Sequence, residues 1–91
     1  MLVWYRTSEH DRISEAYHQV TDGLAGTAGL LRSELIRSVA DQDSYAILSD
    51  WQSLAALRAW ENGTGHGTPE PLRPFSDHAR PGGAFAIYQV T

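Results

Sequence analysis

Apolar residues recur at even spacings along two neighbouring stretches in the middle of the chain, from Gly29 to Val39 and from Ser44 to Trp51, although polar and apolar groups mix on both faces. Successive side chains of an extended chain point to opposite faces, so this period of two predicts two strands. On the first strand, Leu31, Leu35 and Val39 are expected to share a face. On the second, the shared face is expected to carry Tyr45, Ile47, Ser49 and Trp51. The short acidic segment 41–43 between them has hairpin length.

Helical spacing appears on either side of this hairpin. The earlier segment places Ile13, Ala16, Tyr17, Val20 and Leu24 on one side of a helix. Ser8 followed by Asp11 resembles a capping box and predicts that this helix begins there. After the hairpin, Leu54, Leu57 and Trp60 predict a second helix, capped by Asp50 or Ser53.

Two outer strands complete the pattern, at 2–7 and 84–90, with a short helical piece expected within 71–78. The order β-α-β-β-α-β predicts an α+β, ferredoxin-like fold: a four-stranded antiparallel sheet with both helices on one face, as a single domain of residues 1–91. Apolar side chains occur on both faces of the central strands, so a second copy is expected to cover the other face. The sequence therefore predicts a homodimer, a dimeric α/β barrel.

Composition removes several classes of function. The net charge of −4 comes without a basic cluster, which argues against nucleic-acid binding. The chain has no Cys, and its seven Lys and Arg positions are all Arg, which excludes thiolate and lysine Schiff-base chemistry. His10 and His18 lie more than two helical turns apart, so no metal pair is expected. Neither a membrane-spanning run nor a signal peptide is seen, which predicts a cytoplasmic protein.

Several segments together resemble antibiotic biosynthesis monooxygenase domains. They are Gly-Leu-Leu-Arg-Ser at 29–33, Ser-Asp-Trp-Gln-Ser at 49–53, Arg-Ala-Trp-Glu at 58–61 and Pro-Gly-Gly-Ala-Phe at 81–85. The resemblance implies a dimer of ferredoxin-like sheets packed face to face, each subunit holding a pocket between its sheet and helices. Some members oxidise aromatic polyketides with molecular oxygen and neither metal nor flavin, others degrade haem, and others have non-redox roles.

The resemblance carries over at some positions and fails at others. Trp51 matches a Trp of the polyketide-oxidising type, whereas Ile47 and Leu57 stand where that type has Asn and Tyr. Arg73 corresponds to an Arg that follows the second helix in that type. Trp60 matches a helical Trp of the haem-degrading type, but that type's iron-ligating His has no counterpart here. Haem degradation is therefore not expected, and the resemblance implies no cofactor.

Each candidate residue also has a structural interpretation. Trp51 and Tyr45 would line a flat pocket for an aromatic small molecule or pack in the core, and Trp60 is closer to pure packing. His66, in the Gly-rich loop 62–71, would reach a pocket mouth or remain a surface residue. Arg73 would stabilise an anion or pair with Asp77 one helical turn later.

Three functions follow from these candidates. The first is a cofactor-independent monooxygenase acting on an aromatic polyketide or a related phenol in natural-product biosynthesis, with Trp51, Arg73 and His66 in catalytic roles. Tyr45, Ile47, Leu57 and Trp60 would then contact the substrate. The second is a non-redox polyketide cyclase or isomerase on the same scaffold. The third is a non-catalytic ligand-binding dimer whose pocket is filled by side chains.

Overall fold

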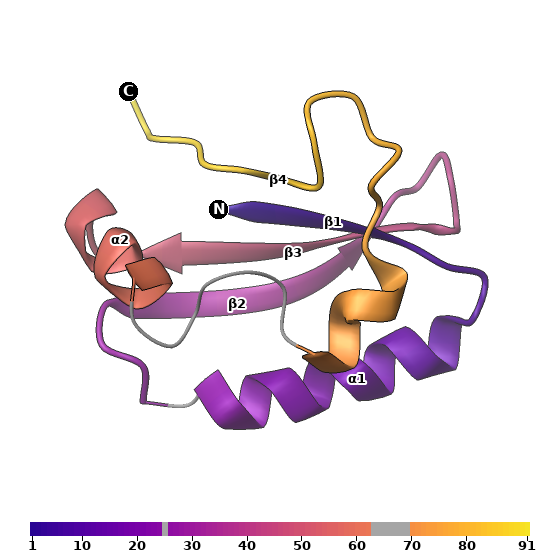
Figure 1. The fold of residues 1–91 in the computed structure, drawn as a ribbon, viewed down its shortest axis with the longest axis horizontal. Helices are drawn as coiled ribbons and strands as arrows, with labels where there is room; N and C mark the ends of the chain where they lie inside the picture. Colours follow the sequence, from indigo (N-terminus) through magenta and orange to yellow (C-terminus); the bar gives the residue numbers. More distant parts are fainter. Residues whose placement is uncertain (25, 63–69) are drawn as a thin grey trace.

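In the computed structural model, which describes residues 1–24, 26–62 and 70–91, a curved sheet is flanked by helices (Figure 1). The strands are β1 (Leu2–Arg6), β2 (Leu30–Arg37), β3 (Ser44–Trp51) and β4 (Phe85–Ala86). The helices are α1 (His10–Leu24), α2 (Leu54–Asn62) and the 3₁₀-helix η1 (Glu70–Phe75). The predicted element order is confirmed, including the short helical piece before the last strand.

The sheet has the order β2-β3-β1-β4, and β3 runs antiparallel to both β1 and β2. Strand β3 therefore lies between β1 and β2, which α1 connects. Strand β1 likewise lies between β3 and β4, which are connected through α2. Right-handed crossovers place the helices of both halves on the same face of the sheet. This interleaved arrangement confirms the α+β, ferredoxin-like fold class predicted from the sequence.

One end of the helix-covered face forms a closed apolar core. Its buried side chains come from β1, α1, β3 and η1: Tyr5, Ile13, Ala16, Val20, Tyr45, Leu72 and Phe75. We call this set the closed end. Ile13 and Leu72 are 0% exposed, and Tyr5 and Tyr45 are cross-strand partners beneath them. The helical periodicity of α1 thus buries the residues that its sequence spacing predicted.

The start of β2 departs from simple alternation. The pairing register shifts between Leu30, which lies opposite Trp51, and Arg32, which lies opposite Asp50. This irregularity leaves Leu31 66% exposed, while Leu35 packs against the closed end. Val39 lies beyond the strand and is fully exposed. The prediction that Leu31, Leu35 and Val39 share a face is therefore wrong, because a bulge breaks the period of two.

The last strand is shorter than the sequence predicts, with two residues in place of the expected 84–90. The edge of β1 is divided between two segments. The N–H of Asp77 donates to the carbonyl of Trp4 at 3.1 Å, and Tyr5 forms a bridge with Ser76. Leu2 and Val3 pair with Ala86 and Phe85, so the residues after Ala86 continue past the first residue of β1. The segment that follows leaves Tyr88 and Val90 exposed.

Helix α1 begins two residues later than Ser8. The N–H of Ile13 donates to the carbonyl of Glu9 at 3.2 Å, so Glu9 occupies the cap position. The hydroxyl of Thr7 accepts the N–H of Glu9 at 3.0 Å and fixes the turn before the helix. The predicted capping box of Ser8 and Asp11 is therefore wrong, because Thr7 supplies the hydroxyl at this turn.

Candidate functional site

Trp51, the last residue of β3, packs against Trp60, which lies in the last turn of α2. The ring centroids of Trp51 and Trp60 lie 5.2 Å apart, with an angle of 42° between the ring planes. Both side chains are only partly buried. Large aromatic surfaces gain most from burial, so a partly buried indole pair beside a sheet is suited to a flat aromatic ligand. We call this region the tryptophan end.

Gly29 allows α2 to lie against the start of β2. Its φ is +83°, and a Cβ at this position would collide with the Cβ of Ala56 on α2. The carbonyl of Gly29 also accepts the N–H of Gln52 at 2.7 Å, directly after Trp51. Only glycine combines this backbone conformation with so close an approach. The position of Trp51 therefore depends on a residue without a side chain.

Helix α2 is capped by Ser53, one of the two residues predicted for that role. The Ser53 hydroxyl accepts the N–H of Ala56 at 3.1 Å. Leu57, 3% exposed, anchors the inner face of the helix, and Trp60 follows three residues later on the same side. The cap and the Leu57 anchor together orient Trp60 toward Trp51.

The indole N–H of Trp51 is already engaged within the protein. It donates to the hydroxyl of Ser49 at 3.1 Å, and Ser49 is a buried polar residue, 5% exposed. Ser33 is the cross-strand partner of Ser49, and its hydroxyl accepts the O–H of Tyr17 at 3.4 Å. The hydroxyls of Ser49 and Ser33 thus lie side by side on the helix-facing side of the sheet, and the Tyr17 hydroxyl reaches them from α1. Sequence reasoning missed this row, although serines at inward positions of both strands signalled it.

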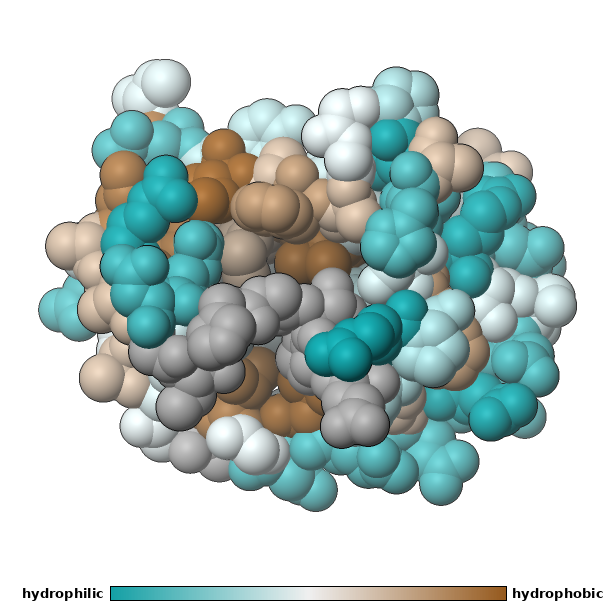
Figure 2. Space-filling model, in the orientation of Figure 1, coloured by the Kyte–Doolittle hydropathy of each residue, from teal (hydrophilic) through white to brown (hydrophobic). Residues whose placement is uncertain are grey.

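An apolar row runs beside these hydroxyls. Cross-strand pairing aligns Leu35 with Ile47, Ile47 with Val3, and Val3 with Phe85. The row becomes more open toward the β4 edge, where Phe85 is 58% exposed. Hydrophobic side chains gather on this face between α2 and η1 (Figure 2). Ile47 therefore lies in the middle of this apolar row, packed against the closed end.

The remaining predicted site residues are distributed differently. Tyr45 belongs to the closed end, and the strand rise puts it about 20 Å from Trp51 along β3. Arg73 is exposed on η1, which packs against α1, and it forms no ion pair with Asp77. His66 lies outside the described residues. Trp51 and Trp60 thus meet, with Leu57 on the Trp60 side of α2, whereas Ile47 packs against the closed end, and Tyr45 and Arg73 lie toward that end of the sheet.

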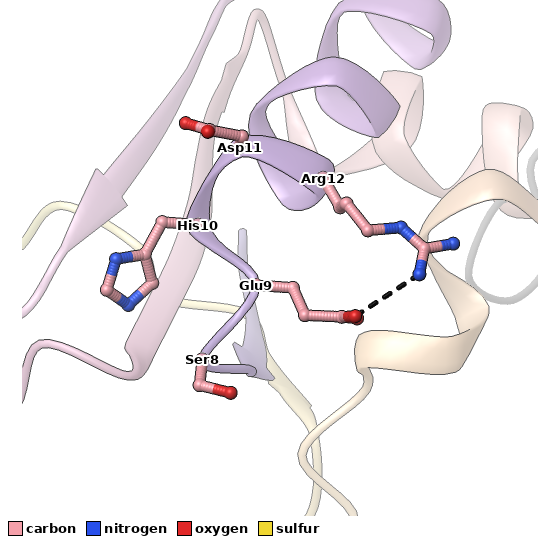
Figure 3. Close-up of a pocket in the computed structure, with 5 residues that line it drawn as sticks. All are labelled: Ser8, Glu9, His10, Asp11 and Arg12. Atoms are coloured by element: carbon pink, nitrogen blue, oxygen red, sulfur yellow. Dashed lines mark hydrogen bonds and ion pairs between the residues drawn. The ribbon is translucent and has the colours of Figure 1, made fainter.

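An open hollow at the start of α1 is lined by one continuous segment, residues 8–12 (Figure 3). Within it, Arg12 pairs with Glu9 at 3.2 Å. His10 points away from that pair, and its Nε2 lies 3.1 Å from Asp43. Arg12 and Glu9 satisfy each other and His10 pairs with Asp43, so the lining of this hollow does not offer the convergent polar groups that a ligand site needs.

The strand order and the two tryptophans thus define a ferredoxin-like fold with an aromatic pair at one end of its helix-covered face. The family model for antibiotic biosynthesis monooxygenase matches residues 3–68. The chain therefore belongs to the antibiotic biosynthesis monooxygenase family, which confirms the resemblance seen in its sequence.

Two curated proteins are similar to the chain. Protein SchA of Streptomyces halstedii is 27% identical over 80 residues, which cover 88% of this chain and 20% of the relative. The 42.8 kDa protein in the whiE locus of Streptomyces coelicolor is 32% identical over 59 residues, covering 64% of this chain and 15% of the relative. The chain thus spans a fifth or less of the length of these relatives. No helix within the described ranges is long and apolar enough to cross a membrane.

Proposed function

We propose that this domain binds a flat aromatic polyketide or a related polycyclic phenol and oxidises it with molecular oxygen, without a bound cofactor. The observation that carries the proposal is the partly buried pair of Trp51 and Trp60, whose ring centroids lie 5.2 Å apart on the helix-covered side of the sheet. Family membership supports the reaction class. In this proposal Trp51, Trp60 and Ile47 contact the rings of the substrate.

The reaction needs only a substrate that forms a stable anion. An anthrone-type substrate loses a proton, and its anion transfers one electron to O₂. The resulting radical and superoxide combine to a peroxide, which takes up a proton and loses water to give a quinone. One substrate and one O₂ thus yield one quinone and one water. The domain has to bind the rings, hold the anion and exclude competing solvent.

The proposal includes a homodimer formed by the sheet face opposite the helices. That face carries Leu2, Trp4, Ile36 and Leu48, with Ile36 40% exposed. It also carries Arg32, whose Nε lies 2.6 Å from the carboxylate of Asp50. An apolar strip bordered by paired charges is suited to a second copy of the same face. Leu48→Arg is expected to give a monomer in analytical ultracentrifugation, while Leu31→Arg at the sheet edge keeps the dimer.

Oxygen uptake tests the proposed reaction. With an anthrone as substrate, the protein should consume O₂ at the same rate with and without a chelator, and yield a quinone by mass spectrometry. Trp51→Phe and Trp60→Phe should each lower kcat/KM, because both contact the rings. Tyr88→Phe, at a position that is 70% exposed, is the matched control and should not change it. An absence of oxygen uptake with every polycyclic phenol or anthrone tested would refute the oxygenase.

A cyclase or isomerase is the second candidate. It is favoured by the apolar Ile47 and Leu57 and by the engagement of the Trp51 N–H with Ser49, which leaves this donor unavailable to a developing oxyanion. Such an enzyme would produce an isomer of the substrate in equal yield with and without air. A gain in product mass only in air would select the oxygenase instead.

A further inference from the structure

One carboxylate oxygen at the tryptophan end is shielded and has no partner. The Oε1 atom of Glu61 is buried, and it accepts no hydrogen bond, although the Glu61 side chain as a whole is 26% exposed. Leaving a shielded acceptor unpaired is unfavourable, because its lost hydrogen bonds to water are not replaced. Such an unsatisfied acceptor calls for an explanation, and a catalytic role is one of those known.

Helix geometry places this carboxylate on the inner side of α2. Glu61 follows Leu57 by four residues, so the two share a helix face, and Leu57 is buried against the domain. Trp60 is the neighbouring residue and meets Trp51. The second carboxylate oxygen, Oε2, lies 3.6 Å from the guanidinium of Arg58 on the outer side. One oxygen therefore faces a cation at the surface while the other is held inside.

Other carboxylates are arranged differently. Asp50 and Glu34 pair with Arg32 on the opposite sheet face, and Asp41 pairs with Arg6 near the hairpin. Among the described residues with a side-chain acceptor, Glu61 is the one that combines a shielded, unpaired oxygen with a place beside the indole pair. In the sequence, Glu61 stands out only as the last residue of the Arg-Ala-Trp-Glu segment at 58–61.

We infer that Glu61 is the proton acceptor for the substrate, an inference that rests on the proposed function. Its Oε1 takes the proton from the acidic C–H or O–H of an anthrone or phenol lying against Trp60. The bond from hydrogen to substrate breaks, a bond to Oε1 forms, and the electron pair remains on the substrate as an anion. After O₂ has added, the carboxylic acid returns this proton to the peroxide anion. Dehydration of that hydroperoxide then releases water and restores the starting site.

Proton abstraction can be measured separately from oxidation. In D₂O under argon, the acidic CH₂ of anthrone should exchange to CD₂ faster with the protein than without it, as followed by NMR. Glu61→Gln keeps the size of the side chain but cannot accept the proton, so this exchange should fall by about 100-fold or more. Glu15→Gln, on the exposed side of α1, is the matched control and should exchange at the wild-type rate.

A small carboxylate added to the solution distinguishes a proton acceptor from a merely structural residue, because it would not restore exchange if Glu61 were only structural. Glu61→Ala should regain exchange in the presence of formate, because formate supplies the missing carboxylate. The rate of anthrone exchange with Glu61→Gln should rise only as base in the solution ionises the substrate. A Glu61→Gln protein that exchanges anthrone at the wild-type rate would overturn the assignment.

The failures of the two proposals are distinguishable. Exchange that depends on Glu61 without any oxygen uptake in air would retain Glu61 as the base and overturn the oxygenase. Oxygen uptake that is unchanged in Glu61→Gln would retain the oxygenase and overturn Glu61. The absence of both exchange and uptake in the wild-type protein would overturn both.

Discussion

The two ends of the helix-covered face are built on different principles. At the closed end, Tyr5, Ile13 and Leu72 are almost completely shielded and come from three separate elements. At the tryptophan end, Trp51 and Trp60 remain half-buried, and one oxygen of Glu61 is shielded without a partner. The same sheet thus carries a filled core at one end and incompletely satisfied groups at the other.

This difference separates stability from binding. Apolar burial contributes about 25 cal/mol per Å², so the closed end supplies most of what holds the helices to the sheet. Half-buried aromatic rings and an unpaired acceptor contribute less to the stability of the folded state. Under the proposed function, a bound substrate would cover the rings and complete their burial. A small domain can afford such a region because the opposite end is densely packed. The predictions below compare the two ends directly.

The largest effect is expected from Leu72→Ala at the closed end. Leu72 is 0% exposed, so its truncation leaves a cavity and should lower the free energy of unfolding by about 2–5 kcal/mol. Urea unfolding followed by circular dichroism measures this loss. Leu31→Ala, at a position that is 66% exposed, should change stability by less than about 0.5 kcal/mol. Equal losses in the two variants would contradict the description of the closed end.

A slightly smaller effect is expected from Gly29→Ala at the tryptophan end. The positive φ costs about 1–2 kcal/mol, and the collision with Ala56 adds to this cost, giving a loss of about 2–4 kcal/mol. Gly26→Ala is the matched control, since Gly26 also has positive φ but has open space around its Cβ position. Its loss should therefore be the smaller of the two in thermal unfolding. Ala56→Gly should partly rescue Gly29→Ala, and a failure of this rescue would argue against the close approach.

Removing the cap of α2 is expected to have a moderate effect confined to one helix. Ser53→Ala leaves the N–H of Ala56 without its side-chain acceptor and should destabilise the protein by about 1 kcal/mol. Ser53→Asp preserves an acceptor and should remain close to wild type. Amide hydrogen exchange should show faster exchange at α2 than at α1 in Ser53→Ala. Uniformly faster exchange across both helices would mean that the two ends do not open separately.

The smallest effect is expected at the hairpin near the closed end, where Asp41 accepts a hydrogen bond from Arg6 at 2.7 Å. This bond is the main reason that the pKa of Asp41 lies below its ordinary value. A lowered folded pKa stabilises the protein above the unfolded pKa, and this stability is lost as the pH falls through the folded pKa. The stability difference between wild type and Asp41→Asn should therefore shrink in acid. Urea unfolding across the acid range tests this, with Asp22→Asn as the control.

Much of the fold follows from local patterns in the sequence. The periods along α1, β2 and β3 predict those elements, because a helix or strand that buries one side must repeat its apolar residues at its own period. The Ser53 cap and the shared face of Tyr45 and Ser49 also follow from short-range spacing. Grouping Trp51 with Trp60 required only the order of strand and helix around them.

Other features were decided only by contacts between distant segments. Three such features are the bulge beside Leu31, the short β4 and the cap at Glu9. Each depends on which neighbouring segment supplies the hydrogen-bonding partner at an edge or a turn. The burial of Tyr45 in the closed end follows from where η1 packs, although Tyr45 and the less buried Trp51 lie on one strand face.

The chemistry at the tryptophan end shows the same division. The sequence determined that indoles, serines and a carboxylate occur near the strand-to-helix junction. Only the tertiary structure decided that the Trp51 N–H bonds to Ser49 and that one Glu61 oxygen is shielded without a partner. Periodicity specifies the direction of a side chain, whereas hydrogen-bond partners and solvent access depend on every element packed around it.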